Sequence, residues 1–187
     1  MESDRNRVCP VELAGGLDNK IRRWLQNPKR ILSPYVKEGM TVLDLGCGPG
    51  FFSVAMAGMV GKTGKVLSAD LQEGMLQKVC DKIKGTELEN RIQLVKCKKD
   101  SVNVHDQVDF ILTFYMIHEV QDKNSLFKQL RALLKDGGQF LLVEPKLFHV
   151  SRAEFAATTK IAEENGFSVN AGPKLPFSWS ALLKPRA

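Results

Sequence analysis

The sequence contains few cysteines and lacks any apolar run long enough to cross a membrane. Its four cysteines are scattered, and no two of them have the CxxC spacing. Neither a zinc site nor a disulfide framework is indicated, so we predict no metal ion. A membrane helix needs about 20 consecutive apolar residues, and no signal-peptide hydrophobic region follows Met1. We therefore expect a cytoplasmic protein that does not associate with membranes.

The sequence also lacks the mixture of basic and aromatic residues that is typical of RNA-binding modules. Its net charge of +6 could attract nucleic acid or acidic ligands. However, the lysines are spread along the chain among acidic residues, and the one dense cluster, at residues 96–99, contains no aromatic residue. A solvated surface explains this pattern better than a nucleic-acid interface, so we expect no nucleic-acid partner.

The chain of 187 residues is long enough for one domain with a sizeable core. Short apolar runs alternate with amphipathic stretches, which predicts strands alternating with helices. We expect strands at 42–45, 65–70, 91–95, 108–113, 139–145, 167–169 and 177–183, and helices at 28–36, 51–57, 71–83, 122–134 and 151–165. A further helix is expected to run through Ile21, Trp24 and Leu25.

The most informative stretch is a short apolar strand followed by a glycine turn and a helix. The turn contains Gly46, Gly48 and Gly50 at alternate positions. Because glycine has no Cβ, such a turn can be tight and its backbone can approach a ligand closely. The first N–H groups of the following helix favour a carboxylate or a phosphate. Asp44, inside the strand, can pair with a cation, so a ligand with both an ammonium and a carboxylate fits these groups.

The spacing of the glycines separates this turn from other nucleotide-binding loops. The dinucleotide fingerprint is GxGxxG, whereas this turn is GxGxG with an acidic residue two positions before the first glycine. No G-K-[ST] follows, which excludes a P-loop. The string VLDLGCGPG at residues 42–50 closely resembles motif I of the class I S-adenosylmethionine (SAM) methyltransferases. A glycine turn in some other α/β fold is the alternative.

The resemblance covers residues 28–184 approximately, with further segments in the family's order. These are the strand ending at Asp70, the segment around His118 and the strand after the Gly-Gly pair at 137–138. The chain is most similar to the small-molecule type-11 branch, which includes quinone-biosynthesis C-methyltransferases and arsenite methyltransferases. The resemblance implies a Rossmann-like α/β fold with helices on both faces of an open, mostly parallel seven-stranded sheet whose last strand is antiparallel.

The resemblance also implies how the chain is divided. Residues 28–187 would form a single SAM-dependent methyltransferase domain. Residues 1–27 would form a prefix that either lies over the ligand pocket as a lid or packs on the sheet edge.

The resemblance implies SAM as the cofactor, held at the carboxyl ends of the strands. Asp70 ends an apolar strand, the position of a carboxylate that hydrogen-bonds both ribose hydroxyls; the alternative is an exposed helix cap. Family members have an acidic residue after the third strand that meets the adenine amino group. This sequence has Lys98 there, unless the register shifts and Asp100 takes that role. The expected cofactor-binding residues are Asp44, Gly46, Cys47, Gly48, Gly50, Asp70, Leu71, Lys98 and Phe114.

Methyl transfer from a sulfonium is an in-line displacement, in which positioning and desolvation supply much of the rate. A base is needed only if the acceptor must lose a proton. His118 is the best candidate because its unperturbed pKa lies near neutrality. Tyr115 can orient the acceptor, and Glu119 or Glu144 can steady His118. Alternatively, His118 makes a structural hydrogen bond at a helix start and Glu144 is structural.

The sequence favours a small-molecule acceptor. No Asn/Asp-Pro-Pro-Tyr/Phe segment occurs at residues 113–116, which argues against the common nucleobase and glutamine N-methyltransferases of this fold. An arsenite methyltransferase would need several thiols close together to bind arsenic, whereas we interpret each cysteine here as a buried or inert thiol. We therefore expect an enzyme that methylates a small molecule. The alternatives are a non-catalytic SAM-binding subunit of a larger complex and an RNA methyltransferase.

Overall fold

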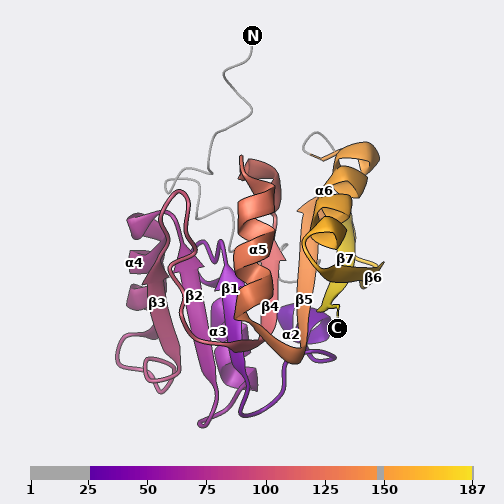
Figure 1. Ribbon diagram of the computed structural model, residues 1–187. Helices are drawn as coiled ribbons and strands as arrows, with labels where there is room; N and C mark the ends of the chain where they lie inside the picture. Colours follow the sequence, from indigo (N-terminus) through magenta and orange to yellow (C-terminus); the bar gives the residue numbers. More distant parts are fainter. Residues whose placement is uncertain (1–25, 147–149, 187) are drawn as a thin grey trace.

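One seven-stranded sheet forms the centre of the protein, in a computed structural model that describes residues 26–146 and 150–186. The strands are β1 (Thr41–Leu45), β2 (Lys65–Asp70), β3 (Ile92–Lys96), β4 (Val108–Phe114), β5 (Leu134–Pro145), β6 (Phe167–Ala171) and β7 (Ser178–Pro185). Their order in the sheet is β3-β2-β1-β4-β5-β7-β6 (Figure 1). All neighbours pair in parallel except β7, which is antiparallel to β5 and β6. The expected sheet, with its antiparallel last strand, is confirmed.

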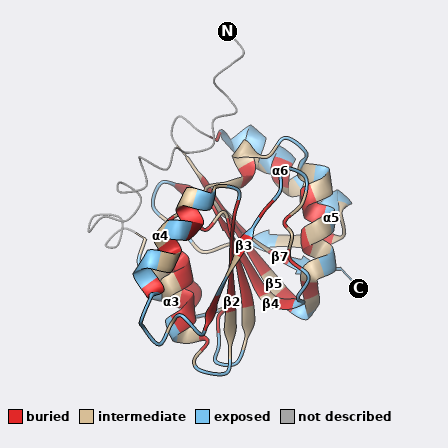
Figure 2. Ribbon diagram, turned by 90° about the vertical axis from the view of Figure 1, so that its left-hand side faces the viewer, coloured by how far each residue is buried: buried red, intermediate tan, exposed pale blue. Residues whose placement is uncertain are grey.

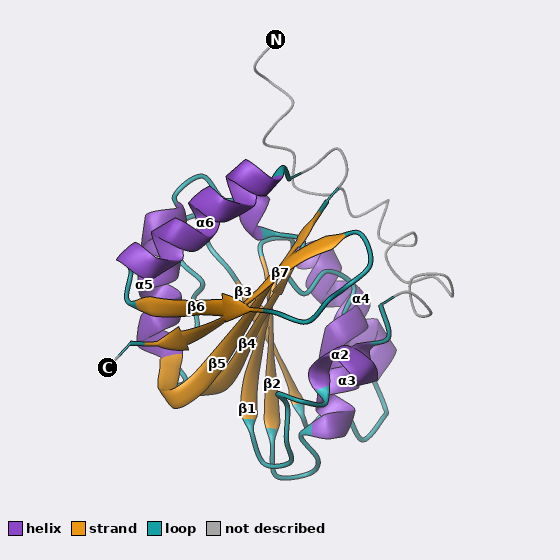
Figure 3. Ribbon diagram, turned by 90° about the vertical axis from the view of Figure 1, so that its right-hand side faces the viewer, coloured by secondary structure: helices purple, strands orange, loops and turns teal. Residues whose placement is uncertain are grey.

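Helices cover both faces of this sheet, as the sequence predicts. They are α2 (Pro28–Leu32), α3 (Phe51–Met59), α4 (Glu73–Ile83), the 3₁₀ turn η2 (Ile117–Glu119), α5 (Lys123–Leu133) and α6 (Arg152–Glu164). The first three α-helices pack on one face, and α5 and α6 pack on the other (Figure 3). The central strands are therefore shielded from solvent on both sides (Figure 2).

Alternation along each strand supplies the two cores. Leu43 and Leu45 point to the cluster under α5 and α6, whereas Val42 points to the cluster under α2, α3 and α4. All three side chains are buried. Because both faces are covered, the strands are continuous apolar runs, which is the pattern that identified them in the sequence.

Several element boundaries differ from the expectations for local reasons. The first described helix ends at Leu32, because Pro34 has no N–H with which to continue the helical hydrogen bonds. Helix α4 begins at Glu73, after Gln72 N–H donates to the carboxylate of Asp70 at 2.8 Å. Strand β5 begins at Leu134, before a bulge in its pairing with β4.

Two expectations about the N-terminal segment fall outside the described residues. The helix through Ile21, Trp24 and Leu25 lies in residues 1–25, so it stays a prediction. The lid or edge-packing role of residues 1–27 also stays a prediction, because only Gln26 and Asn27 of that segment are described. Within the ranges that the structure describes, no helix has the length and apolar character needed to span a bilayer.

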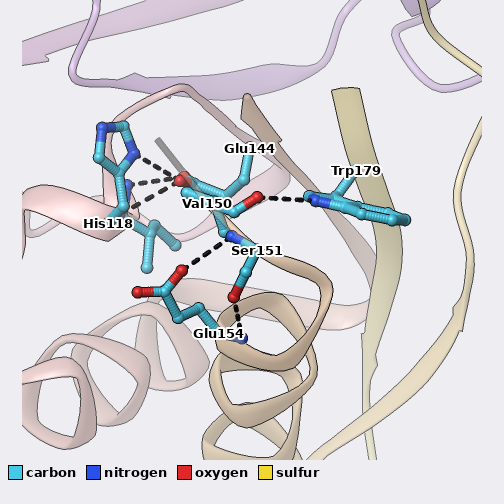
Figure 4. Close-up of polar contacts among 7 residues, drawn as sticks. His118, Glu144, Val150, Ser151, Glu154 and Trp179 are labelled. Atoms are coloured by element: carbon cyan, nitrogen blue, oxygen red, sulfur yellow. Dashed lines mark hydrogen bonds and ion pairs between the residues drawn. The ribbon is translucent and has the colours of Figure 1, made fainter. Parts of the chain in front are cut away.

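The start of α6 carries the clearest helix cap, and its stability contribution can be tested. Ser151 Oγ accepts from Glu154 N–H at 3.2 Å, and the Glu154 carboxylate accepts from Ser151 N–H at 2.8 Å (Figure 4). We expect Ser151→Ala to lower the free energy of unfolding by about 1 kcal/mol in urea denaturation, because one N–H loses its acceptor. Lys160→Gln, on the exposed surface of the same helix, should change it by less than about 0.5 kcal/mol. Equal effects of both changes would contradict the capping role.

Candidate cofactor and acceptor site

The turn after β1 is held in a conformation that suits glycine. Gly46, Gly48 and Gly50 have φ angles of +72°, +52° and +83°, in the left-handed region that side chains disfavour. The N–H groups of Gly46 and Cys47 both donate to the carbonyl of Ala69, at 2.8 and 3.1 Å. These two hydrogen bonds fix the turn to the end of β2.

The three glycines differ in what surrounds them. A Cβ at Gly46 would lie 2.8 Å from Met116 Cγ, and one at Gly50 would lie 3.0 Å from Val79 Cγ2. At Gly48, by contrast, no atom lies within 4 Å of the position that a Cβ would take. Gly46 and Gly50 are therefore constrained by close packing, whereas Gly48 leaves exposed backbone in front of an open space.

That open space belongs to a cavity of about 530 Å³ at the carboxyl edge of the sheet, within the size range of small-molecule sites. Its walls come from the glycine turn, the segments after β2, β3 and β4, and the start of α5. Gly50 does not line it. The candidate residues that do are Asp44, Gly46, Cys47, Gly48, Asp70, Leu71, Lys98, Phe114 and Tyr115.

Two buried carboxylates line the cavity beside the glycine turn. Asp44 accepts a hydrogen bond of 2.5 Å from Ser53 Oγ. Asp70 accepts from Gly48 N–H at 2.9 Å and from Gln72 N–H at 2.8 Å. Burial raises the pKa of Asp70, although these two N–H groups oppose the rise. Because Asp70 is only 7% exposed and Gln72 is the N-cap residue of α4, Asp70 is not an exposed helix cap.

The cysteines near the cavity are poor nucleophiles. Cys47 and Cys97 are both buried. Burial raises the pKa of Cys47 well above its usual value and that of Cys97 to about 12. Since the thiolate is the reactive form, both thiols are protonated near neutrality, in agreement with the prediction of inert thiols.

The segment after β3 brings both candidates for adenine recognition to the cavity wall. Lys98 N–H donates to Ser101 O at 2.8 Å, which closes a tight turn. Asp100 is in this turn, and its carbonyl accepts from Gln129 Nε2 at 3.0 Å. Lys98, Asp100 and Gln129 all line the cavity. The sequence analysis did not identify Gln129 as a cavity residue. It lies on the amphipathic helix α5, and no motif in the surrounding sequence distinguishes it.

Glu144 organises the segment after β4 from the neighbouring strand. Its buried carboxylate accepts from the backbone N–H groups of Ile117 and His118 at 2.9 and 3.3 Å, and lies 2.5 Å from His118 Nδ1 (Figure 4). Burial alone would lower the pKa of His118, but the hydrogen bond and charge of Glu144, with the charge of Glu119, raise it above its usual value. Neither His118 nor Glu144 lines the cavity, whereas Glu119 does.

Tyr115 joins the cavity to two distant segments. Its φ angle is +64°, and its N–H donates to Val143 O at 2.9 Å. The phenol oxygen lies 2.6 Å from Ser178 Oγ and accepts from Gln26 Nε2 at 2.9 Å. Gln26 and Ser178 are 89 and 63 positions away in the sequence, so no local pattern could have identified them.

Comparison with known proteins agrees with this geometry. The family model described as a methyltransferase domain matches residues 36–179. The ubiquinone/menaquinone biosynthesis C-methyltransferase UbiE of Escherichia coli is 31% identical over 110 residues, covering 58% of this chain and 44% of that relative. The chain thus matches somewhat less than half the length of this relative.

Two solved structures show the same fold. A SAM-dependent methyltransferase from Aquifex aeolicus superposes with a TM-score of 0.82 and 24% identity, covering 94% of this chain and 98% of that one. A SAM-dependent O-methyltransferase from Thermotoga maritima gives a TM-score of 0.68 and 19% identity, covering 87% of this chain and 65% of that one. Because the family model spans most of the chain, this protein belongs to the methyltransferase domain family.

Proposed function

We propose that this enzyme transfers the methyl group of SAM to a small-molecule acceptor by in-line displacement. The observation that carries the proposal is the open space at Gly48, where bare backbone faces a cavity flanked by the buried carboxylates of Asp44 and Asp70. SAM supplies a methyl group that the positive charge on its sulfur has already activated. The protein then has to bind, orient and desolvate the two reactants.

The described residues fit the parts of SAM. The backbone at Gly48 allows the amino-acid part of SAM to approach closely, and the Asp44 carboxylate can pair with the ammonium group of SAM. Asp70 can accept from the ribose hydroxyls, because a carboxylate oxygen that already accepts one N–H has a second lone pair. Lys98, Leu71 and Phe114 line the same cavity and complete the proposed cofactor contacts.

The acceptor is proposed to bind beyond the ends of β4 and β5. Tyr115 lines the cavity there, and the turn η2 places Glu119 on the wall with His118 beside it. Tyr115 would orient the acceptor. Where the acceptor must lose a proton, His118 would take it at Nε2, because Nδ1 shares its proton with Glu144. The similarity to UbiE, a C-methyltransferase of quinone biosynthesis, supports a small acceptor.

Calorimetric titration with SAM and with S-adenosylhomocysteine tests the proposal directly, and Gly48→Val sharpens it. A branched side chain at Gly48 would occupy the space where the ligand meets the backbone, so we expect affinity for both compounds to fall at least tenfold. Gly85→Val is the matched control, because Gly85 also has a positive φ, +71°, and no atom within 4 Å of a Cβ. Equal losses in the two variants would show that backbone strain, and not the site, is responsible.

Removing the carboxylate of Asp70 should weaken cofactor binding. We expect Asp70→Ala to cost about 1–3 kcal/mol of binding free energy, the range for a charged hydrogen-bond partner. Asp106→Ala, which removes an exposed carboxylate paired with Lys65, should leave the affinity within twofold. Unchanged affinity in Asp70→Ala would mean that another residue contacts the ribose.

A base at His118 predicts a pH dependence of turnover. Only the neutral imidazole accepts a proton, and the pKa of His118 is raised, so the rate should increase as pH rises through a value above 6.5. His118→Ala should remove this rise and lower turnover while S-adenosylhomocysteine affinity stays within twofold. The assay is transfer of labelled methyl to an acceptor found by screening phenols, thiols and amines. Turnover unchanged in His118→Ala, as expected for the exposed control His105→Ala, would show that His118 is structural.

A further inference from the structure

Phe177 combines two unusual features, an exposed aromatic side chain and a left-handed backbone. It is 61% exposed, and only one other large apolar residue of residues 26–146 and 150–186, Leu71, is also exposed. Leu71 lines the ligand cavity, so its exposure has a functional explanation. Phe177 also has a φ angle of +54°, which is an outlier for a bulky side chain.

The strain at Phe177 arises in a tight turn. Ser178 N–H lies 3.4 Å from Leu175 O, which closes a four-residue turn with Pro176 and Phe177 in the middle. Proline in the second position and a positive φ in the third are the pattern of a type II turn, which favours glycine or asparagine in the third position. Phenylalanine is therefore unfavourable for stability at this position, because its backbone has a positive φ and its apolar ring is exposed to solvent.

This turn is joined to the wall of the cavity through Ser178, and Phe177 itself is not among the wall residues. The carbonyl of Phe177 accepts from Lys146 N–H at 2.8 Å, and Ser178 pairs with Pro145 at the end of β5. Ser178 Oγ lies 2.6 Å from the phenol oxygen of Tyr115, which lines the cavity. The loop that leads into the turn runs on the side of α2 (Figure 3), and its Leu175 packs against the core cluster of that face.

We propose that Phe177 contacts the methyl acceptor, and that this acceptor presents a planar apolar ring. The inference rests on the proposed function, in which a small molecule binds beyond the ends of β4 and β5. The turn is held by hydrogen bonds at Phe177 O and Ser178 N, so the phenyl ring is presented from a fixed backbone. An aromatic ring on a preorganised support offers a flat apolar contact at little entropic cost. A residue that is unfavourable for folding is retained where it serves a ligand.

The test measures binding of 1-naphthol to the complex of the protein with S-adenosylhomocysteine, by calorimetry. We expect Phe177→Gly and Phe177→Asn each to weaken 1-naphthol binding at least fivefold, with S-adenosylhomocysteine affinity unchanged within twofold. Asparagine tolerates the left-handed backbone, so it separates loss of the ring from added flexibility. Phe177→Gly should also raise the Tm by about 2–4 °C, because the strain is relieved. Pro176→Ala, the exposed neighbour in the same turn, should leave 1-naphthol binding within twofold.

The outcomes distinguish this inference from the function on which it rests. If the wild-type protein binds S-adenosylhomocysteine but not 1-naphthol, or if both Phe177 variants bind 1-naphthol as tightly as wild type, the inference is overturned and the cofactor site stands. A lower Tm in Phe177→Gly would also overturn it, because the ring would then serve the fold. If the wild-type protein does not bind S-adenosylhomocysteine, the proposed function fails and the inference fails with it.

Discussion

The attachment of the glycine turn to the end of β2 is the constraint on which the site depends. Two N–H groups, from Gly46 and Cys47, share the carbonyl of Ala69, and Gly48 N–H reaches the carboxylate of Asp70 on the same strand. These bonds hold the turn and the second acidic residue together. A preorganised wall of this kind lowers the entropic cost of binding, and it needs left-handed backbone at three alternate positions, which glycine adopts without strain.

The segment after β4, which forms another wall of the cavity, is held by side chains and not by a glycine turn. Glu144 and Tyr115 hold the segment after β4 through contacts with β5, β7 and Gln26. The buried carboxylate of Glu144 accepts hydrogen bonds from three N–H groups. These bonds compensate for the loss of hydration that burial of a charged group entails. The cavity therefore combines a wall built around the glycine turn and the end of β2 with a wall assembled from several separate segments.

Much of the fold and of the glycine turn could be predicted from the sequence because the governing interactions are local. The apolar run before Gly46 predicts β1, and Ser151 predicts the cap of α6. Pro34 also acts locally, and its effect on the helix that ends at Leu32 could have been anticipated from the sequence. The position of His118 beside the cavity, and not on its wall, depends on the buried Glu144 and could not be anticipated in this way.

The sequence by itself determined the alternation of strands and helices, the glycine turn and the acidic residues within two strands, since backbone preferences and hydrophobic periodicity act over a few residues. The tertiary structure alone decided which distant groups meet. It placed antiparallel β7 between β5 and β6, and so brought Ser178 to the hydroxyl of Tyr115 across 63 positions. It also brought Gln26 to the same hydroxyl across 89 positions. Such contacts follow from strand order and from the packing of whole elements, and no short stretch of sequence contains them.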